Sequence, residues 1–299
     1  MVPEFDWYQA TVPHGVDDVL ECLSGLDEGL KLSHARGHHG YAHTAVLGSE
    51  LRGDVARVWH GGSHEYPHVV LSGHWAQPGA ELIRASFPEH KVARVDVRQD
   101  FDGADAYDRM QVQLLDVAAR CRVKVSTAGD HLLTMKGRTL YLGSPKADVR
   151  MRLYDKAEEM RSKIVAPRTA GIDMAEWYRG WGVPEHLTRL EAQIRPHTPG
   201  AKAAFATIQP VDALGSAAWM REVWKQIAGL DLRPVKVGKG WRQSDDERAY
   251  RYLLASYGGV LRRLQATLGS WECVGLQLGE DLRADSSLAT QPEDGASRP

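Results

Sequence analysis

Four stretches of this 299-residue chain alternate between apolar and polar residues over most of their length, and this pattern restricts the fold more than any other feature. They are ARVDVRQD (93–100), RTLYLGS (138–144), VRMRLYDK (149–156) and TRLEAQIR (188–195). Because successive side chains of a strand point to opposite faces, each stretch has one apolar face and one face of charges and tyrosines. The pattern predicts an antiparallel sheet with one face on a core and the other open to water.

The rest of the chain predicts an α+β protein with helices flanking this central sheet. KVARVDVRQDF (91–101) reads as a strand, a further strand is expected at 132–136, and YDRMQVQLLDVAARC (107–121) reads as a helix. We expect three parts: a sheet-based domain at 1–200, a mostly helical part at 201–279 packed on it, and a disordered tail at 280–299. The tail is polar and rich in Pro, Ser and Gly.

Charge is balanced over the whole chain but concentrated in one segment. The formal net charge is −2. Between Arg120 and Arg168, however, there are twelve Lys or Arg against five Asp or Glu. A local basic patch can hold a polyanion because electrostatic fields are short-ranged at physiological salt. The alternative is an ordinary solvated surface.

The cysteines and the hydropathy indicate a cytoplasmic protein. Cys22, Cys121 and Cys273 are scattered, so they form neither a metal motif nor a disulfide framework, and they fit a reducing compartment. The opening residues do not have the pattern of a secretory signal. We expect no membrane span, because no apolar run approaches the roughly 20 residues that a bilayer requires.

The charged faces of the predicted strands have the chemistry of a phosphodiester-cleaving site. Carboxylates two to four residues apart on one strand, with one from another strand, can hold Mg²⁺ or Mn²⁺. Arg and Lys around them suit phosphate, and a tyrosine hydroxyl beside such an ion can attack a phosphodiester. The alternative is a sheet whose polar face is simply solvated.

The segment TLYLGSPKADVRMRLYDKAEE (139–159) resembles the motif of the Rep_trans replication initiation factors, T-x-Y-x-G-S-x-x-S followed by R-x-Y-D-K. ARVDVRQD is similar to the family's R-x-D-x-x-x-D strand, and LTRLEAQIR is similar to its R-x-E strand. The opening FDWYQATV is also similar. The resemblance covers about residues 90 to 200, and it departs at Ala147, where the family usually has Ser.

The resemblance implies a rolling-circle replication initiator of a plasmid or filamentous phage. Such an enzyme nicks one DNA strand at a specific site, keeps the 5′ phosphate as a phosphotyrosine and later rejoins the strand. The implied fold is a nicking nuclease related to the two-histidine (HUH) enzymes, with carboxylates replacing the histidines. The absence of any H-x-H pair agrees with that replacement. The alternatives are a mobile-element relaxase of the same family, a non-catalytic origin-binding regulator, and an unrelated metal phosphoesterase that uses water.

The resemblance also implies roles for individual residues. Tyr141 is the catalytic nucleophile, and Lys156 and Arg152 contact or polarise the scissile phosphate. The implied ligands of the divalent cation, Mg²⁺ or Mn²⁺, are Asp96, Asp100 and Glu191. We expect a further set of cations to bind DNA or phosphate, namely Arg94, Arg98, Arg138, Lys146, Arg150, Arg152 and Arg189.

Two questions stay open from the sequence. Tyr154 shares the predicted face of Tyr141, so it is either a second nucleophile or a packing partner.

The expected binding partner of the protein is origin DNA, a supercoiled duplex with an extruded or single-stranded nick site. A host helicase and a homodimer are further partners that the resemblance leaves open, and the sequence identifies neither the replicon nor the origin.

Overall fold

The computed structural model describes residues 2–50, 53–164, 172–238 and 245–288. The chain divides into two compact units, residues 1–240 and 241–299. The second unit contains α9 (Asp245–Leu268) and α10 (Trp271–Leu288), which pack on each other. The expected division near residue 200 falls within the first unit, because the helices that follow residue 200 join the core of the sheet.

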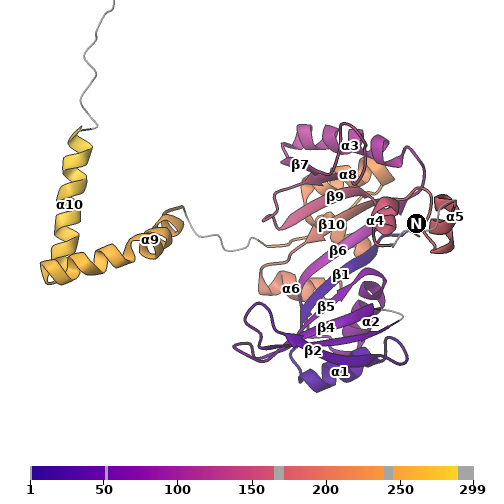
Figure 1. Ribbon diagram of the computed structural model, residues 1–299, viewed down its shortest axis with the longest axis horizontal. Helices are drawn as coiled ribbons and strands as arrows, with labels where there is room; N and C mark the ends of the chain where they lie inside the picture. The colour runs from indigo at the N-terminus through magenta and orange to yellow at the C-terminus, as the bar shows by residue number, and fades with distance from the viewer. Residues whose placement is uncertain (1, 51–52, 165–171, 239–244, 289–299) are drawn as a thin grey trace, which may run out of the picture. The chain divides into compact units, whose positions relative to one another are not determined.

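In the described parts of the chain, ten strands form one antiparallel sheet in the order β2-β3-β4-β5-β1-β6-β10-β9-β8-β7 (Figure 1). The strands are β1 (Glu4–Thr11), β2 (Lys31–Arg36), β3 (His43–Ser49), β4 (Gly53–His60), β5 (His68–Ser72), β6 (Lys91–Phe101), β7 (Val125–Ala128), β8 (Thr139–Leu142), β9 (Val149–Asp155) and β10 (Thr188–Ile194). β6 therefore lies between β1 and β10, although these two strands are far apart in sequence. The predicted α+β class with a central antiparallel sheet is confirmed.

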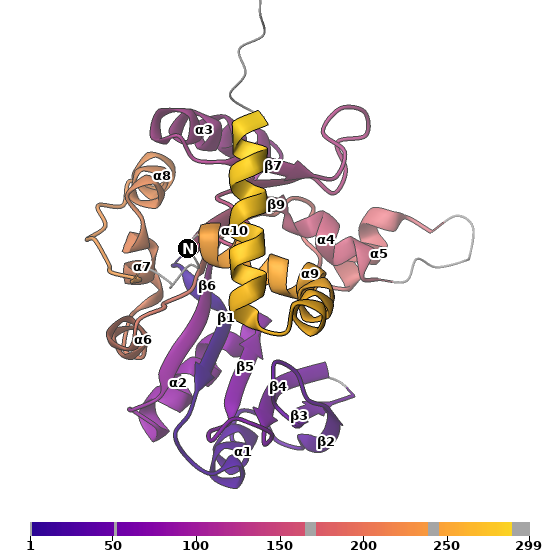
Figure 2. The ribbon, with the colours of Figure 1, turned by 90° about the vertical axis from the view of Figure 1, so that its left-hand side faces the viewer.

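Several helices pack on the apolar face of the sheet, and two short helices lie on the other side. The helical elements of this unit are α1 (Val16–Ser24), η1 (Gly73–Trp75), α2 (Ala76–Ser86), α3 (Ala106–Cys121), α4 (Lys156–Ser162), α5 (Met174–Gly180), α6 (Pro199–Phe205), α7 (Pro210–Ala213), η2 (Leu214–Ser216) and α8 (Ala218–Ala228). α2 contacts β1 and β5, α3 contacts β8 and β9, and α6 and α7 contact β6. Figure 2 shows α6, α7 and α8 on one side of the sheet and α4 and α5 on the other.

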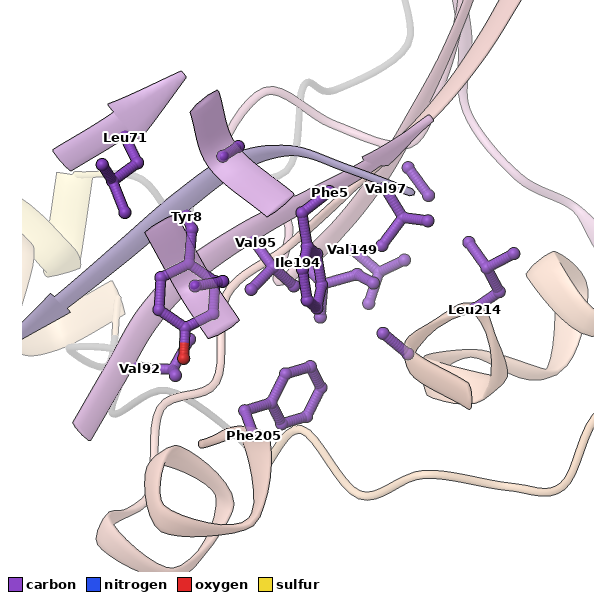
Figure 3. Packing of buried hydrophobic residues seen from close by; sticks show 14 of the residues in the cluster. Phe5, Tyr8, Leu71, Val92, Val95, Val97, Val149, Ile194, Phe205 and Leu214 are labelled. Atoms are coloured by element: carbon purple, nitrogen blue, oxygen red, sulfur yellow. The ribbon is translucent and has the colours of Figure 1, made fainter. Parts of the chain in front are cut away.

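The strand register confirms the predicted division of the sheet into an apolar and a charged face. Val95 and Val97 of β6 are fully buried, as is Ile194 of β10. They pack with Phe205 and Leu214 from the covering helices (Figure 3). Each such side chain contributes about 1.5–3 kcal/mol when it is removed from water. The apolar face is thus fixed by burial, and the charged face must point away from these helices.

A β-bulge in β1 changes which side chains of that strand reach the charged face. Phe5 and Tyr8 are both fully buried, although residues three apart in a regular strand point to opposite faces. The register of β1 against β6 shifts between Phe5 and Trp7, which places both aromatic rings in the core. The intervening Asp6 contacts Arg98 and Arg189 on the charged face.

Two local predictions differ from the structure. Residues 132–136 form part of a loop between β7 and β8 instead of a strand, because the Asp130 side chain accepts hydrogen bonds from the backbone there. Helix α10 extends to Leu288, into the expected tail, since Pro first occurs in this region beyond that residue. Residues 289–299 lie outside the described residues. Among the described helices, none combines the length and hydropathy that a membrane-spanning segment needs.

Candidate active site

One row of opposed residues crosses four strands of the charged face. Arg98 of β6 lies opposite Glu191 of β10, which lies opposite Arg152 of β9. Arg152 in turn lies opposite Tyr141 of β8. Directly opposed residues on antiparallel strands are close enough for their side chains to interact. The structure therefore brings together residues that lie far apart in sequence.

The Tyr141 side chain stands at the junction of two hollows. One, of about 500 Å³, is lined by Tyr141 and Arg152 with residues of α4 and of the segment before β8. The other, of about 110 Å³, adds Arg94, Arg150 and Glu191. The Arg150 guanidinium lies over the Tyr141 ring, 4.0 Å from its centroid.

Two guanidinium groups beside Tyr141 retain unused donors. Within the described parts of the chain, Nε of Arg150 and Nε of Arg152 have no hydrogen-bond partner. Both residues line the smaller hollow with Tyr141. Guanidinium N–H groups match the oxygens of phosphate in geometry and charge. Both Nε atoms are buried, whereas the Arg152 side chain as a whole is 43% exposed, so its guanidinium group can reach a phosphate in the hollow.

Asp96 and Glu191 form a buried acidic pair next to this row. Each is only 2% exposed. Arg94 binds both oxygens of Asp96, with Nε 2.7 Å from Oδ1, and Nη2 of Arg152 donates to Oε2 of Glu191 at 2.7 Å. Burial, followed by the charge of Asp96, raises the pKa of Glu191 to about 7. A positive charge between the two carboxylates would relieve this repulsion.

Asp100 is already fully engaged on the same face. Arg189 donates to its two oxygens, from Nε at 2.6 Å and from Nη2 at 2.8 Å. The Arg189 Nη1 also donates to Asp6 Oδ1 at 3.0 Å, and Nη1 of Arg98 donates to the same oxygen at 3.0 Å. In this cluster the two carboxylates, Asp6 and Asp100, are paired with the two guanidinium groups of Arg98 and Arg189.

The carboxylates fit a divalent cation in part. Across the described residues, no group of three or more His, Cys, Asp or Glu side chains is arranged to hold a metal ion. Asp96 and Glu191 are diagonal neighbours on β6 and β10, because Glu191 lies opposite Arg98. Mg²⁺ in enzymes is often held by one or two carboxylates together with substrate phosphate and water. All three carboxylates are held by arginine, Asp96 by Arg94, Glu191 by Arg152 and Asp100 by Arg189. Asp96 and Glu191 are the pair that could hold such an ion, and only by exchanging these arginines for it.

The proposed phosphate-binding cations differ in their availability. Arg189 is buried and bound to carboxylates, while Lys146 is exposed in the turn between β8 and β9. Arg138 donates to Asp108 on α3 at 2.6 Å. Lys156, at the start of α4, pairs with Glu159.

Lys156 does not line either of the two hollows that reach Tyr141. It lines a third hollow of about 670 Å³, together with Tyr154 and Asp6. α4 begins there because the Asp155 side chain accepts a hydrogen bond from the Glu158 backbone N–H at 2.8 Å. The structure thus places Lys156 at the Asp6 side of the charged face.

Tyr154 has the contacts of a packing partner. It is 8% exposed, and its hydroxyl donates to Glu191 Oε2 at 3.5 Å. Burial and the negative charge of Glu191 raise the pKa of the Tyr154 phenol. Deprotonation of this hydroxyl is therefore disfavoured, in keeping with the second of the two roles left open by the sequence.

Gly143, which follows Tyr141 and Leu142, allows a close approach of two strands. Its φ is +94°, and a Cβ there would lie 2.9 Å from the Val149 carbonyl oxygen. The residue is buried, so it positions β8 against β9 and is not itself a contact surface.

Sequence reasoning missed Asp6. Regular alternation in FDWYQATV places Asp6 on the same face as the buried Tyr8 and Ala10, so the pattern indicates an inward residue. The bulge between Phe5 and Trp7 reverses that assignment. One signal in the sequence could have indicated that Asp6 lies on the charged face. Asp6 is an acidic residue between two aromatic residues, Phe5 and Trp7, at the start of a strand.

No protein-family model matches the chain, and no curated protein matches it. Among solved structures, the chain is similar to the rolling circle replication initiator protein from Geobacillus stearothermophilus, at 19% sequence identity. The match covers 80% of this chain and 99% of that chain, with a TM-score of 0.49.

Proposed function

We propose that this protein is a rolling-circle replication initiator that nicks one DNA strand with Tyr141 and later rejoins it. The observation that carries the proposal is the hollow that Tyr141 shares with Arg94, Arg150 and Arg152, in which the Arg150 guanidinium lies 4.0 Å from the centroid of the tyrosine ring. Guanidinium groups gathered around a tyrosine have the charge and geometry to hold a phosphate beside its hydroxyl. The resemblance of TLYLGSPKADVRMRLYDK to the Rep_trans motif supports the same reaction.

The reaction is a transfer of a phosphoryl group between two oxygens. The Tyr141 hydroxyl oxygen attacks the scissile phosphorus, a tyrosine–phosphorus bond forms, and the bond from phosphorus to the 3′ oxygen breaks. The phenol loses its proton, and the released 3′ oxygen gains one. Arg150 and Arg152 offset the charge that develops on the non-bridging oxygens. Because a phosphate ester replaces a phosphate ester, the reverse reaction can reseal the strand.

Asp96 and Glu191 are the proposed ligands of a divalent cation, Mg²⁺ or Mn²⁺. When bound, such an ion would offset charge on the scissile phosphate. Asp100 has a different proposed role, since its bidentate pair with Arg189 positions β6 against β10. Origin DNA is the proposed partner.

The direct test uses supercoiled DNA of the parent replicon with Mg²⁺ or Mn²⁺, stopped with a denaturing detergent. We expect nicked circles that carry covalent protein. Tyr141→Phe should lower adduct formation by more than about 1,000-fold, because the nucleophile is removed. The matched control is Tyr154→Phe, which removes a hydroxyl from the same face and should keep the adduct.

Each other outcome identifies a different function. Nicking that survives Tyr141→Phe would assign the chemistry to Tyr154 or to water. DNA binding without any nick would favour a non-catalytic regulator. Loss of the adduct in both variants would mean that the hydroxyl of Tyr154 is also required.

A further inference from the structure

The loop between β7 and β8 exposes two leucines at its tip. Leu132 and Leu133 are each 88% exposed, and Met135 beside them is 51% exposed. Single exposed apolar residues are common on protein surfaces. Two adjacent leucines that are almost fully exposed to water are less common. These two lie on a loop that leads directly into β8, the strand of Tyr141, which indicates a function in binding.

The Asp130 side chain holds this loop in one conformation. Its Oδ1 accepts hydrogen bonds from the backbone N–H groups of Leu132 and Leu133, both at 2.9 Å. Its Oδ2 accepts from the N–H and the hydroxyl of Thr134, both at 2.8 Å. These bonds hold the Asp130 pKa well below its ordinary value. The leucines are thus presented on a preorganised backbone.

Further features fix the ends of the loop. Gly129 has a φ of +84°, and a Cβ there would lie 2.1 Å from the Gly137 carbonyl oxygen, so only glycine fits. Met135 has a φ of 56°, a conformation that costs a non-glycine residue about 1 kcal/mol or more. Arg138 anchors the exit of the loop on α3, because it donates to Asp108 and lies over the Tyr107 ring.

The loop borders the hollow of the candidate nucleophile. Lys136, Gly137 and Arg138 line the same hollow of about 500 Å³ as Tyr141. The cations on this wall suit the phosphate backbone of DNA. A protein partner fits less well, since two side chains supply a small part of the roughly 800 Å² that each partner buries in a standard interface.

We infer that Leu132 and Leu133 form a wedge that inserts between bases beside the scissile phosphate and holds the strands apart there. Apolar side chains, leucine included, unstack base steps in this way in other DNA-binding proteins. The cost of unstacking is a few kcal/mol per step, which explains why the loop is rigid before DNA arrives. This inference rests on the DNA substrate of the proposed function and is independent of its covalent step.

The test measures strand separation without cleavage. Supercoiled DNA of the parent replicon is mixed with the Tyr141→Phe protein, and unpaired thymines are detected with permanganate. We expect reactive thymines at one locus. The double variant Leu132→Ser with Leu133→Ser, in the same background, should lower this reactivity by about tenfold or more. DNA retention should persist, because the cations remain.

Three control variants distinguish a specific role of Leu132 and Leu133 from a general loss of structure or of surface apolar side chains. Val112→Ser removes an apolar side chain from α3 that is 68% exposed, and it should not change thymine reactivity. Asp130→Ala, which frees the loop backbone, should lower reactivity. Asp130→Asn keeps one acceptor oxygen, enough for two of the four hydrogen bonds, and should lower reactivity less than Asp130→Ala does. The leucine variant should unfold at the wild-type urea concentration, since both side chains are exposed.

The outcomes separate this inference from the proposed function. Leucine-dependent thymine reactivity supports the wedge even if the wild-type protein forms no covalent adduct, in which case only the proposed function falls. Equal reactivity with and without the leucines would overturn the wedge while the nicking reaction stands. The absence of reactive thymines with the native loop would also overturn it.

Discussion

The two ends of the charged face use the same residue types for opposite purposes. At the Tyr141 end, Nε of Arg150 and Nε of Arg152 have no partner among the described residues. At the Asp6 end, Arg189 donates three hydrogen bonds to two carboxylates. Arg189 donates to carboxylates from all three guanidinium nitrogens, whereas Arg152 donates from Nη2 to Glu191 and its Nε has no partner among the described residues. The proposed function assigns the arginines at the Tyr141 end to a ligand. Substitutions should therefore divide into those that lower stability and those that lower activity.

The largest effect is expected at the Asp6 end. Arg189→Ala would remove a buried arginine and leave the half-buried Asp100 without its bidentate partner and Asp6 with Arg98 alone. We expect the free energy of unfolding to fall by about 3–5 kcal/mol, measured by urea titration. A fall in the free energy of unfolding of less than about 1 kcal/mol would show that the cluster around Arg189 does not stabilise the fold. The Asp6 end and the Tyr141 end of the charged face would then no longer differ in this respect.

The acidic pair should make stability depend on pH. The pKa of Glu191 rises from 4.5 to about 7, so in that range the folded protein holds a proton that the unfolded chain releases. Stability from this group is present below pH 4.5 and is lost as pH rises through 7. Relative to Glu191→Gln, the wild type should lose about 3 kcal/mol over this range in urea titrations at successive pH values.

Adding Mn²⁺ sharpens this test. Above pH 7 the ion should stabilise the wild type by about 2.7 kcal/mol at a hundredfold excess over its dissociation constant. It should not stabilise Glu191→Gln, which lacks the second carboxylate. Equal stabilisation of both proteins would place the cation elsewhere.

A smaller loss, in activity alone, is expected at the Tyr141 end. Arg150→Ala removes a charge-assisted hydrogen bond of about 1.5–3 kcal/mol, so adduct formation should slow by about 10- to 100-fold. The urea midpoint should stay nearly unchanged. Arg150→Lys keeps the charge without the planar fork and should recover only part of the rate. A large drop in stability for Arg150→Ala would contradict the assignment.

The smallest effect is expected at Lys146. This residue is exposed in the turn between β8 and β9, so Lys146→Ala should leave folding intact. If Lys146 contacts a phosphate, the slope of log affinity against log salt should fall by about 0.9. An unchanged slope, measured by DNA binding at several salt concentrations, would place Lys146 off the path of the DNA.

Alternation predicted the faces of the sheet, but it could not predict how charges pair across strands. The stretch 91–101 became β6, and Val95 and Val97 lie on the expected apolar face because they require a core. The partner of Asp100 depends on the register between β6 and β10, which no local pattern contains. Asp6 was missed because a bulge breaks the period of two. The strand expected at 132–136 failed because the Asp130 side chain satisfies the backbone instead.

The placement of β10 between β6 and β9 sets the order in which the site is completed during protein synthesis. Chains emerge from the ribosome at about 5–20 residues per second, N-terminus first. Tyr141 therefore emerges well before Glu191, and β9, which already has β8 as a neighbour, gains its second neighbour only when Thr188–Ile194 has been made. A truncated chain that ends before β10 would contain Tyr141 and Asp96 without Glu191. If the proposed function is correct, incomplete translation products should therefore lack the complete site.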